Sequence, residues 1–190
     1  AGDPCPLACG FGAVDTRKPM ALEAAEPERV AEATRRMKLR HVVITAVARD
    51  DLPDGGAAHF QQVIRSVREV NPGILIEVLT PDFMDDNAAI DTVLAARPEI
   101  FNHNLETIRR LTPEVRSVAT YDRSLSVLRK VKERSPETFT KSGIMLGLGE
   151  TEEELWEALG DLRAAGCNLL TLGQYLPPTN NHLPAAALIP

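Results

Sequence analysis

The chain has 190 residues, of which 44% are hydrophobic, and a formal net charge of −6. That length suits one domain with a real core, and an acidic chain without a long basic stripe is a poor electrostatic binder of nucleic acid. No apolar run reaches the roughly 20 residues that span a bilayer, and the amino-terminal residues show no basic start followed by an apolar stretch. We therefore expect a cytoplasmic protein with neither a membrane nor a nucleic acid as partner.

Short apolar segments alternate with amphipathic segments along the chain. The apolar segments are rich in Val, Ile and Leu and nearly continuous, which is typical of strands buried on both faces. They predict five strands, at residues 41–47, 74–79, 99–102, 142–148 and 168–173.

The segments between them carry apolar residues at helical spacing. They predict helices at residues 26–38, 57–70, 87–96, 105–111, 122–134 and 151–165. Pro27 fits a first helical turn and Asp122 is expected to cap its helix. Thr151 and Glu154 have the spacing of a capping box.

This alternation predicts parallel βαβ units and an α/β fold. A doubly wound sheet and a barrel both fit it. Polar side chains follow every predicted strand, at residues 49–51, 81–82, 103–104, 149–150 and 174–175. Strand-to-helix loops are commonly polar, but a rim of this kind also favours a barrel, whose sites lie at the carboxyl ends of its strands. Five strands are too few for a closed eight-stranded barrel, and residues 176–190 are Pro-rich and predicted to be an irregular tail.

The three cysteines are Cys5, Cys9 and Cys167. An odd, small number argues against a disulfide scaffold. The Cys5-x-x-x-Cys9 spacing alone is compatible with a metal site, a redox pair, a structural half-site or chance. Cys167 follows a predicted helix and enters a predicted strand, so we expect it to pack in the core rather than to bind a cluster.

Several long strings in fixed order make the chain resemble lipoyl synthase, a family of the radical SAM superfamily. Two of them are Phe101-Asn102-His103-Asn104-Leu105-Glu106-Thr107 and Lys141-Ser142-Gly143-Ile144-Met145. Others lie at residues 13–16, 18–19, 43–45, 49–57, 77–83, 121–125, 146–151, 172–176 and 182–184. The superfamily signature is Cys-x-x-x-Cys-x-x-Cys with an aromatic residue before the third cysteine. Cys5, Cys9 and Phe11 match it, and Gly12 stands at the third cysteine position.

The resemblance implies a partial (β/α)6 TIM-like barrel of parallel strands, here without its first strand. Residues 1–190 would form a single radical SAM core domain, a fragment of the family's length, with residues 1–19 as the cluster-binding loop. Cys5 and Cys9 would hold a [4Fe–4S] cluster whose open iron binds S-adenosyl-L-methionine (SAM). The family uses the 5′-deoxyadenosyl radical made there to insert sulfur from an auxiliary [4Fe–4S] cluster into an octanoyl group. The implied partners are an octanoylated lipoyl-carrier protein or peptide and a reductant such as a flavodoxin or ferredoxin.

The resemblance also implies cofactor-binding residues near the strand ends. Asn104 and Glu106 would bind the ribose or amino-acid part of SAM, although a helix cap with a solvated glutamate fits the same string. Lys141, followed by Ser142, would pair with the SAM carboxylate, although an ordinary lysine at a strand edge is equally compatible. His103 is expected to be a hydrogen-bonded structural histidine.

The adenine end of the implied site falls farther along the chain. Residues 143–150, with Gly147 and Glu150, would let the backbone approach an adenine, although strand glycines also mark tight packing. Gln174 and Tyr175 would complete that end of the pocket. Asp50 and Asp51 would orient substrate or cofactor, or only cap a loop. The residues do not identify a catalytic side chain.

Departures from the family pattern predict an impaired enzyme. Gly12 cannot ligate iron, so the cluster should be labile. Pro6-Leu7, Ala48 and Met84-Asp85-Asp86 also replace common family residues, and the segments that ligate the auxiliary cluster are absent.

Two other functions remain open. One is a catalytically silent barrel that binds SAM or a lipoyl-carrier partner. The other is an aldolase-type barrel with Lys141 as its Schiff-base lysine.

Overall fold

The computed structural model describes residues 20–116 and 118–189. The predicted cluster loop, with Cys5, Cys9 and Gly12, lies outside the described residues.

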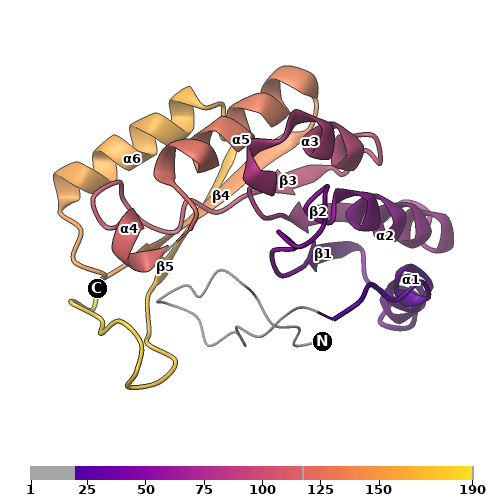
Figure 1. The fold of residues 1–190 in the computed structure, drawn as a ribbon, viewed down its shortest axis with the longest axis horizontal. Coiled ribbons are helices and arrows are strands. Elements are labelled where there is room, and N and C mark those ends of the chain that lie inside the picture. The colour runs from indigo at the N-terminus through magenta and orange to yellow at the C-terminus, as the bar shows by residue number, and fades with distance from the viewer. Residues whose placement is uncertain (1–19, 117, 190) are drawn as a thin grey trace.

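The described residues form one five-stranded parallel sheet, with the strands side by side in chain order (Figure 1). The strands are β1 (His41–Thr45), β2 (Leu75–Leu79), β3 (Ile100–Asn102), β4 (Phe139–Leu146) and β5 (Leu169–Gln174). All five predicted strands are confirmed, and the α/β class with them. β4 begins three residues earlier than predicted because Phe139, Thr140 and Lys141 pair with β3. It ends before Gly147, whose φ of 91° breaks the extended backbone.

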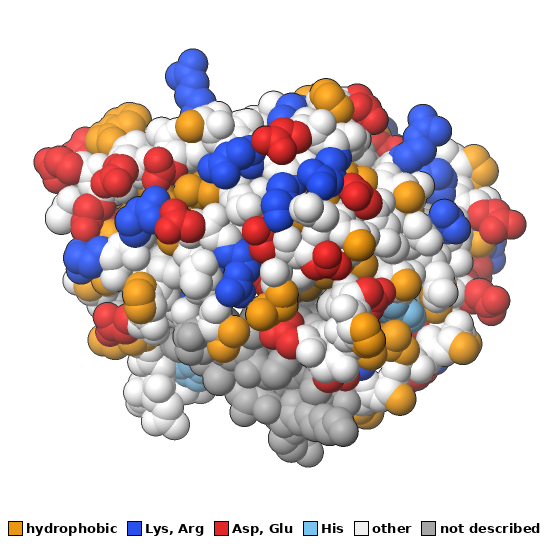
Figure 2. Space-filling view, turned by 45° about the horizontal axis from the view of Figure 1, so that its top comes forward, with side chains coloured by type: hydrophobic (Ala, Val, Ile, Leu, Met, Phe, Trp, Pro, Cys, Tyr) orange, Lys and Arg blue, Asp and Glu red, His pale blue; other side chains and the backbone are white. Residues whose placement is uncertain are grey.

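Helices cover one side of this sheet (Figure 1). They are α1 (Glu26–Arg36), α2 (Ala57–Val70), the 3-10 turn η1 (Phe83–Asp85), α3 (Asn87–Leu94), α4 (Thr112–Val115), α5 (Tyr121–Arg134) and α6 (Glu152–Ala164). Acidic and basic side chains are interspersed in the view of Figure 2, as expected of a solvated surface. Among the helices of the described residues, none combines the length and the apolar composition that a membrane crossing needs.

The structure confirms the helix cap predicted for α6 but not the one predicted for α5. The Thr151 hydroxyl accepts from the Glu154 amide at 3.3 Å, and the Glu154 carboxylate accepts from the Thr151 amide at 2.9 Å, so the capping box is confirmed. The predicted Asp122 cap is wrong. Thr120 caps α5 instead, because its extended backbone points its hydroxyl at the Arg123 amide.

The helix predicted at residues 105–111 is also wrong. Glu106 has φ +69° and forms an isolated parallel bridge to Ile144. Its amide donates to Gly143 O at 2.9 Å, and its carbonyl accepts from the Met145 amide at 2.8 Å. The backbone after β3 is therefore held against β4, and Leu105 and Ile108 reach the core from an irregular segment. Their helical spacing in the sequence was misleading.

Successive residues of each strand point to opposite faces of the sheet. One set faces the helices and the other faces the side that the helices leave uncovered. Ile44, Ile76, Val78 and Phe101 pack under the helices in the larger core cluster. The residues between them project from the other side, which we call the inner face: 41, 43 and 45 of β1, 75, 77 and 79 of β2, 100 and 102 of β3, and 139, 141, 143 and 145 of β4. The inner face and the carboxyl ends of the strands therefore bound one region, in which the functional residues must be sought.

Candidate cofactor and substrate site

Asn104 and Glu106 lie beside β4 at the carboxyl end of β3. A Cβ atom at Gly143 would lie 2.9 Å from Asn104 Oδ1, closer than such contacts allow. The glycine therefore lets the Asn104 amide lie directly against the β4 backbone. The structure thus brings together Asn104, Glu106 and Gly143.

Burial raises the pKa of Glu106, and a hydrogen bond from Asn104 and the charge of Arg116 oppose that rise. A carboxyl group in such a desolvated position gains from any donor that a ligand brings to it. The Asn104–Glu106 pair therefore offers acceptor atoms suited to hydroxyl or amino groups.

Ser142 and Lys141 point to opposite faces of β4. The Ser142 hydroxyl is fully buried under the helices and accepts from the Leu105 amide at 3.1 Å. It positions the backbone that leads to Glu106. Lys141 lies on the inner face, and its ammonium donates to Glu77 Oε1 at 2.8 Å. The sequence had not singled out Glu77, whose side chain is only 2% exposed.

Glu150 and the glycine loop after β4 form a closed hydrogen-bonded turn. The Glu150 carboxylate accepts from the amides of Gly147 at 2.5 Å and of Leu148 at 2.9 Å. Gly147 has a positive φ, and a Cβ there would collide with Ala187 O. Glu150 therefore shapes the loop, and its two oxygens already accept backbone donors.

The chain segment 183–189 lies against the predicted adenine end. Ala186 and Ala187 donate to Gly147 O at 2.7 and 3.3 Å. The Gln174 amide donates to Ala187 O at 3.1 Å and accepts from the Ile189 amide at 2.8 Å. Tyr175, whose pKa is raised by burial, donates its hydroxyl to Leu183 O at 2.8 Å. Gly147, Gln174 and Tyr175 thus meet in space, around a segment of the chain itself.

His103 is the structural histidine that the sequence predicted. It is 2% exposed, with Nδ1 2.9 Å from Thr80 O and Nε2 3.0 Å from Ser124 Oγ. Because a carbonyl only accepts, Nδ1 carries the proton and Nε2 accepts from Ser124. Burial and the neighbouring Arg116 charge lower the pKa of His103 to about 4, so the ring is neutral at pH 7.

Charged side chains also gather at the carboxyl ends of β1 and β2. Asp51 pairs with Arg49 through two hydrogen bonds of 2.8 and 2.9 Å. Burial and the nearby Asp82 raise the pKa of Asp50. Arg123 bonds Asp82 at 3.1 Å.

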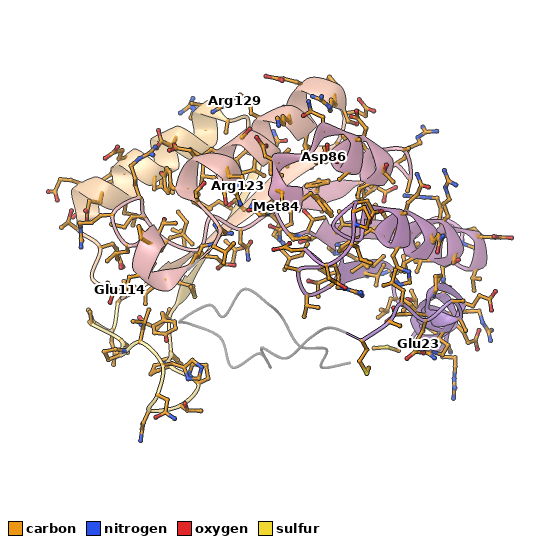
Figure 3. The ribbon with its side chains drawn as sticks, in the orientation of Figure 1. Glu23, Met84, Asp86, Glu114, Arg123 and Arg129 are labelled. Carbon is orange, nitrogen blue, oxygen red and sulfur yellow. The ribbon has the colours of Figure 1, made fainter. Side chains whose placement is uncertain are left out.

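The turn after Asp82 carries one of the departures from the family pattern. Met84 lies next to Arg123 in Figure 3, and its sulfur is 3.7 Å from Arg123 Nη1. Phe83, Met84 and Asp85 all have positive φ values, of 47°, 52° and 62°. The turn is therefore strained, and α5 supports it through Arg123, Ser126 and Lys130.

Within residues 20–116 and 118–189, no group of three or more His, Cys, Asp or Glu side chains is arranged to hold a metal ion. Cys167 packs against the second core cluster at the amino end of β5, and burial raises the pKa of its thiol. A separate pocket lies between α1, α2 and β1, where His59 is 2.7 Å from Glu26. None of the predicted cofactor residues lines that pocket.

Residues 2–162 match the family described as the Radical SAM superfamily. The chain belongs to this superfamily. The match covers most of the chain, including the predicted cluster loop and the Asn104–Glu106 segment.

Curated relatives of this radical SAM chain are named lipoyl synthase. The protein from Thermus thermophilus is 58% identical over 191 aligned residues, covering 100% of this chain and 59% of that protein. The one from Rubrobacter xylanophilus is 56% identical, covering 97% of this chain and 58% of that protein. The chain therefore spans about three fifths of the length of these relatives.

Solved structures share the fold at low sequence identity. Streptococcus suis SuiB bound to S-adenosylmethionine superposes with a TM-score of 0.76 at 13% identity, over 98% of this chain and 42% of SuiB. Methylornithine synthase (PylB) superposes with a TM-score of 0.70 at 17% identity, over 92% of this chain and 51% of PylB. The five-stranded sheet is thus a partial TIM-like barrel of the radical SAM kind.

Sequence reasoning missed Glu77 in this radical SAM fold, although a signal for it existed. Glu77 sits within the apolar string Leu75-Ile76-Glu77-Val78-Leu79. A carboxylate in the middle of a buried strand is costly unless it is paired. The string therefore required a cationic partner, and Lys141 is that partner.

Proposed function

We propose that this chain is the SAM-binding catalytic core of a lipoyl synthase, acting on an octanoyl group carried by a protein or peptide. The observation that carries the proposal is the Asn104–Glu106 pair, held against Gly143 at the carboxyl end of the sheet. It occurs in a chain 58% identical to a curated lipoyl synthase.

Asn104 and Glu106 fit the ribose or amino-acid part of SAM. Their side chains present an amide and a desolvated carboxyl, which match hydroxyl and amino donors. Lys141 lies deeper on the inner face, bound to Glu77, and its ammonium keeps further donors for a ligand. Lys141 is therefore part of the proposed site, near its substrate end.

The adenine end of the proposed site comprises Gly147, Glu150, Gln174 and Tyr175. The Gly147 carbonyl and the Gln174 amide are engaged by residues 186–189. An adenine that used these groups would take the place of that segment. Ser142 contributes indirectly, through the Leu105 amide.

Reduction of SAM by a [4Fe–4S] cluster supplies the radical chemistry of the proposed reaction. Cys5 and Cys9 are the proposed thiolate ligands, and Gly12 leaves the third position without one. We therefore expect a labile cluster and impaired SAM cleavage, with sulfur insertion depending on an auxiliary [4Fe–4S] cluster. This chain's own residues bind and orient SAM.

The proposed partners are an octanoylated lipoyl-carrier protein or peptide and a flavodoxin or ferredoxin as reductant, in the cytoplasm. Relatives named lipoyl synthase support the octanoyl substrate. SuiB, which has the same fold, was solved bound to its precursor peptide, with a TM-score of 0.75.

Calorimetric binding of S-adenosylhomocysteine to the purified chain tests the proposed cofactor residues without needing the cluster. Asn104→Ala and Glu106→Gln should each weaken binding about tenfold, the usual effect of losing one good hydrogen bond to a charged or buried partner. Glu153→Gln, a matched change in the exposed first turn of α6, should leave binding unchanged. Equal affinities for all four proteins would refute the assignment.

Gly12 favours a second candidate, a barrel that binds SAM without cleaving it. Binding that depends on Asn104 and Glu106, without any 5′-deoxyadenosine from the reconstituted chain, would support that candidate.

A further inference from the structure

Side chains from three other strands, β1, β3 and β4, converge on the Glu77 carboxylate of β2. Lys141 Nζ donates to Oε1 at 2.8 Å, and Asn102 Nδ2 donates to the same oxygen at 3.1 Å. His41 Nε2 lies 3.4 Å from Oε2. The Glu77 side chain is 2% exposed and that of Lys141 is 25% exposed, so the pair lies at the bottom of the inner face but is open to a ligand on the lysine side. We call Glu77, Lys141 and Asn102 the floor.

The floor is surrounded by apolar side chains on the same face. Val43, Ile100 and Phe139 lie in one row with Glu77 across the sheet, in direct register. Val43 is 51% exposed and Phe139 55% exposed, which is high for apolar strand residues. Leu75, two residues before Glu77 on the same face, is 52% exposed. A ligand that covers this surface gains from apolar contact.

Pairing makes the centre of this apolar surface electrically neutral. Lys141 alone would present an unopposed ammonium and attract an anion. With Glu77 at 2.8 Å, an incoming carboxylate meets one negative charge for each positive one.

Asn102 adds to the rejection of anions. Its Nδ2 donates to Glu77, which fixes the amide orientation, and its buried Oδ1 has no hydrogen-bond partner among the described residues. Asn102 thus holds Glu77 beside Lys141 and brings no donor to the surface that could bind an incoming carboxylate.

We propose that Glu77 is a specificity-determining residue that neutralises Lys141, so that the floor accepts an uncharged aliphatic acyl chain and rejects one that ends in a carboxylate. This inference rests on the proposed function for its acyl substrate and assigns the selection of that substrate to a residue outside the SAM-binding set.

Two lysine peptides that differ only at the acyl terminus test the proposal. One carries an Nε-octanoyl group and the other an Nε-(7-carboxyheptanoyl) group, and calorimetry measures their binding to the full chain. The wild-type chain should prefer the octanoyl peptide at least about tenfold. Glu77→Gln, which keeps the shape but exposes the lysine charge, should reduce or reverse that preference by about tenfold or more.

Two further variants separate the local charge from net charge and from folding. Glu99→Gln removes one negative charge from a carboxylate that pairs with Arg68 instead, and should leave the preference unchanged. The double change Glu77→Met and Lys141→Met replaces the pair by apolar groups, a change that commonly preserves folding. It should retain the preference for the octanoyl peptide.

Each result bears on a separate claim. An unchanged preference in Glu77→Gln, or an equal change in Glu99→Gln, overturns the role of Glu77. If Glu77→Gln does not fold, loss of the preference in the double variant overturns it. If the wild-type chain binds neither peptide, the acyl substrate of the proposed function fails. In that case, a gain of binding to the carboxylate peptide in Glu77→Gln supports neutralisation, and its absence overturns it.

Discussion

Replacing His103 with glutamine should change how the stability of the protein depends on pH. The histidine is 2% exposed, and burial beside Arg116 lowers its pKa to about 4. In the unfolded chain the same group has an ordinary pKa of about 6.5. Between these two values the unfolded state binds one more proton than the folded state, so the free energy of unfolding falls as the pH falls through this window.

The two pKa values fix the expected size of the effect. Acidification from pH 7 to pH 5 should cost the wild-type protein about 2 kcal/mol through His103 alone, and the full loss down to pH 4 and below approaches about 3 kcal/mol. His103→Gln lacks the titrating group. It should be less stable at pH 7 by about 1–3 kcal/mol, because the hydrogen bonds to Thr80 and Ser124 are weakened.

Urea unfolding of both proteins at pH 7 and pH 5 gives the double difference, in which the carboxylates common to both proteins cancel. The stability gap between wild type and variant should shrink by about 2 kcal/mol at pH 5. A gap that is the same at both pH values would refute a neutral, buried His103.

Two further substitutions, each with a matched control, test other contacts in the structure. Gly143→Ala places a methyl group 2.9 Å from Asn104 Oδ1 and should cost about 1–3 kcal/mol in urea unfolding and weaken S-adenosylhomocysteine binding. Gly173→Ala, with no atom within 4 Å of the added carbon, should change neither, and equal effects of the two would contradict the close approach of Asn104. Thr151→Ala should destabilise the protein by about 1 kcal/mol through loss of the α6 cap, and Thr151→Ser should restore most of it; a serine variant no better than alanine would exclude capping as the cause.

The fold was predictable where local pattern and tertiary environment agree. All five strands are apolar runs that pair in parallel, although β1 and β5 are largely exposed, and the α6 capping box is a purely local signal. Residues 105–111 were not predictable in the same way, because the pairing of Glu106 with Ile144 depends on a strand nearly forty positions away. The backbone pairing overrode the helical spacing of Leu105, Ile108 and Leu111.

The candidate site was likewise predictable in one part and not in another. Asn104 and Glu106 follow a strand, as the sequence indicates, and the structure places both against Gly143 of the adjacent strand. The pairing of Lys141 with Glu77 was missed because their separation of 64 positions hides it in the sequence, although a glutamate inside an apolar strand requires a partner.

The hydrogen bonds between Gln174 and residues 186–189 also could not be predicted from the sequence. It consists largely of backbone hydrogen-bonding groups, which every residue carries and which therefore leave no sequence pattern.

The formation of 5′-deoxyadenosine from SAM tests the central claim, that this chain is a radical SAM core, most directly. The wild-type chain and Gly12→Cys are reconstituted anaerobically with iron and sulfide, reduced with dithionite and compared for product. Gly12→Cys should form product and the wild-type chain little or none, because the third thiolate is needed to retain the cluster. Equal product from both proteins would contradict the role assigned to Gly12, and no product from an iron-loaded Gly12→Cys protein would contradict radical SAM catalysis by this chain.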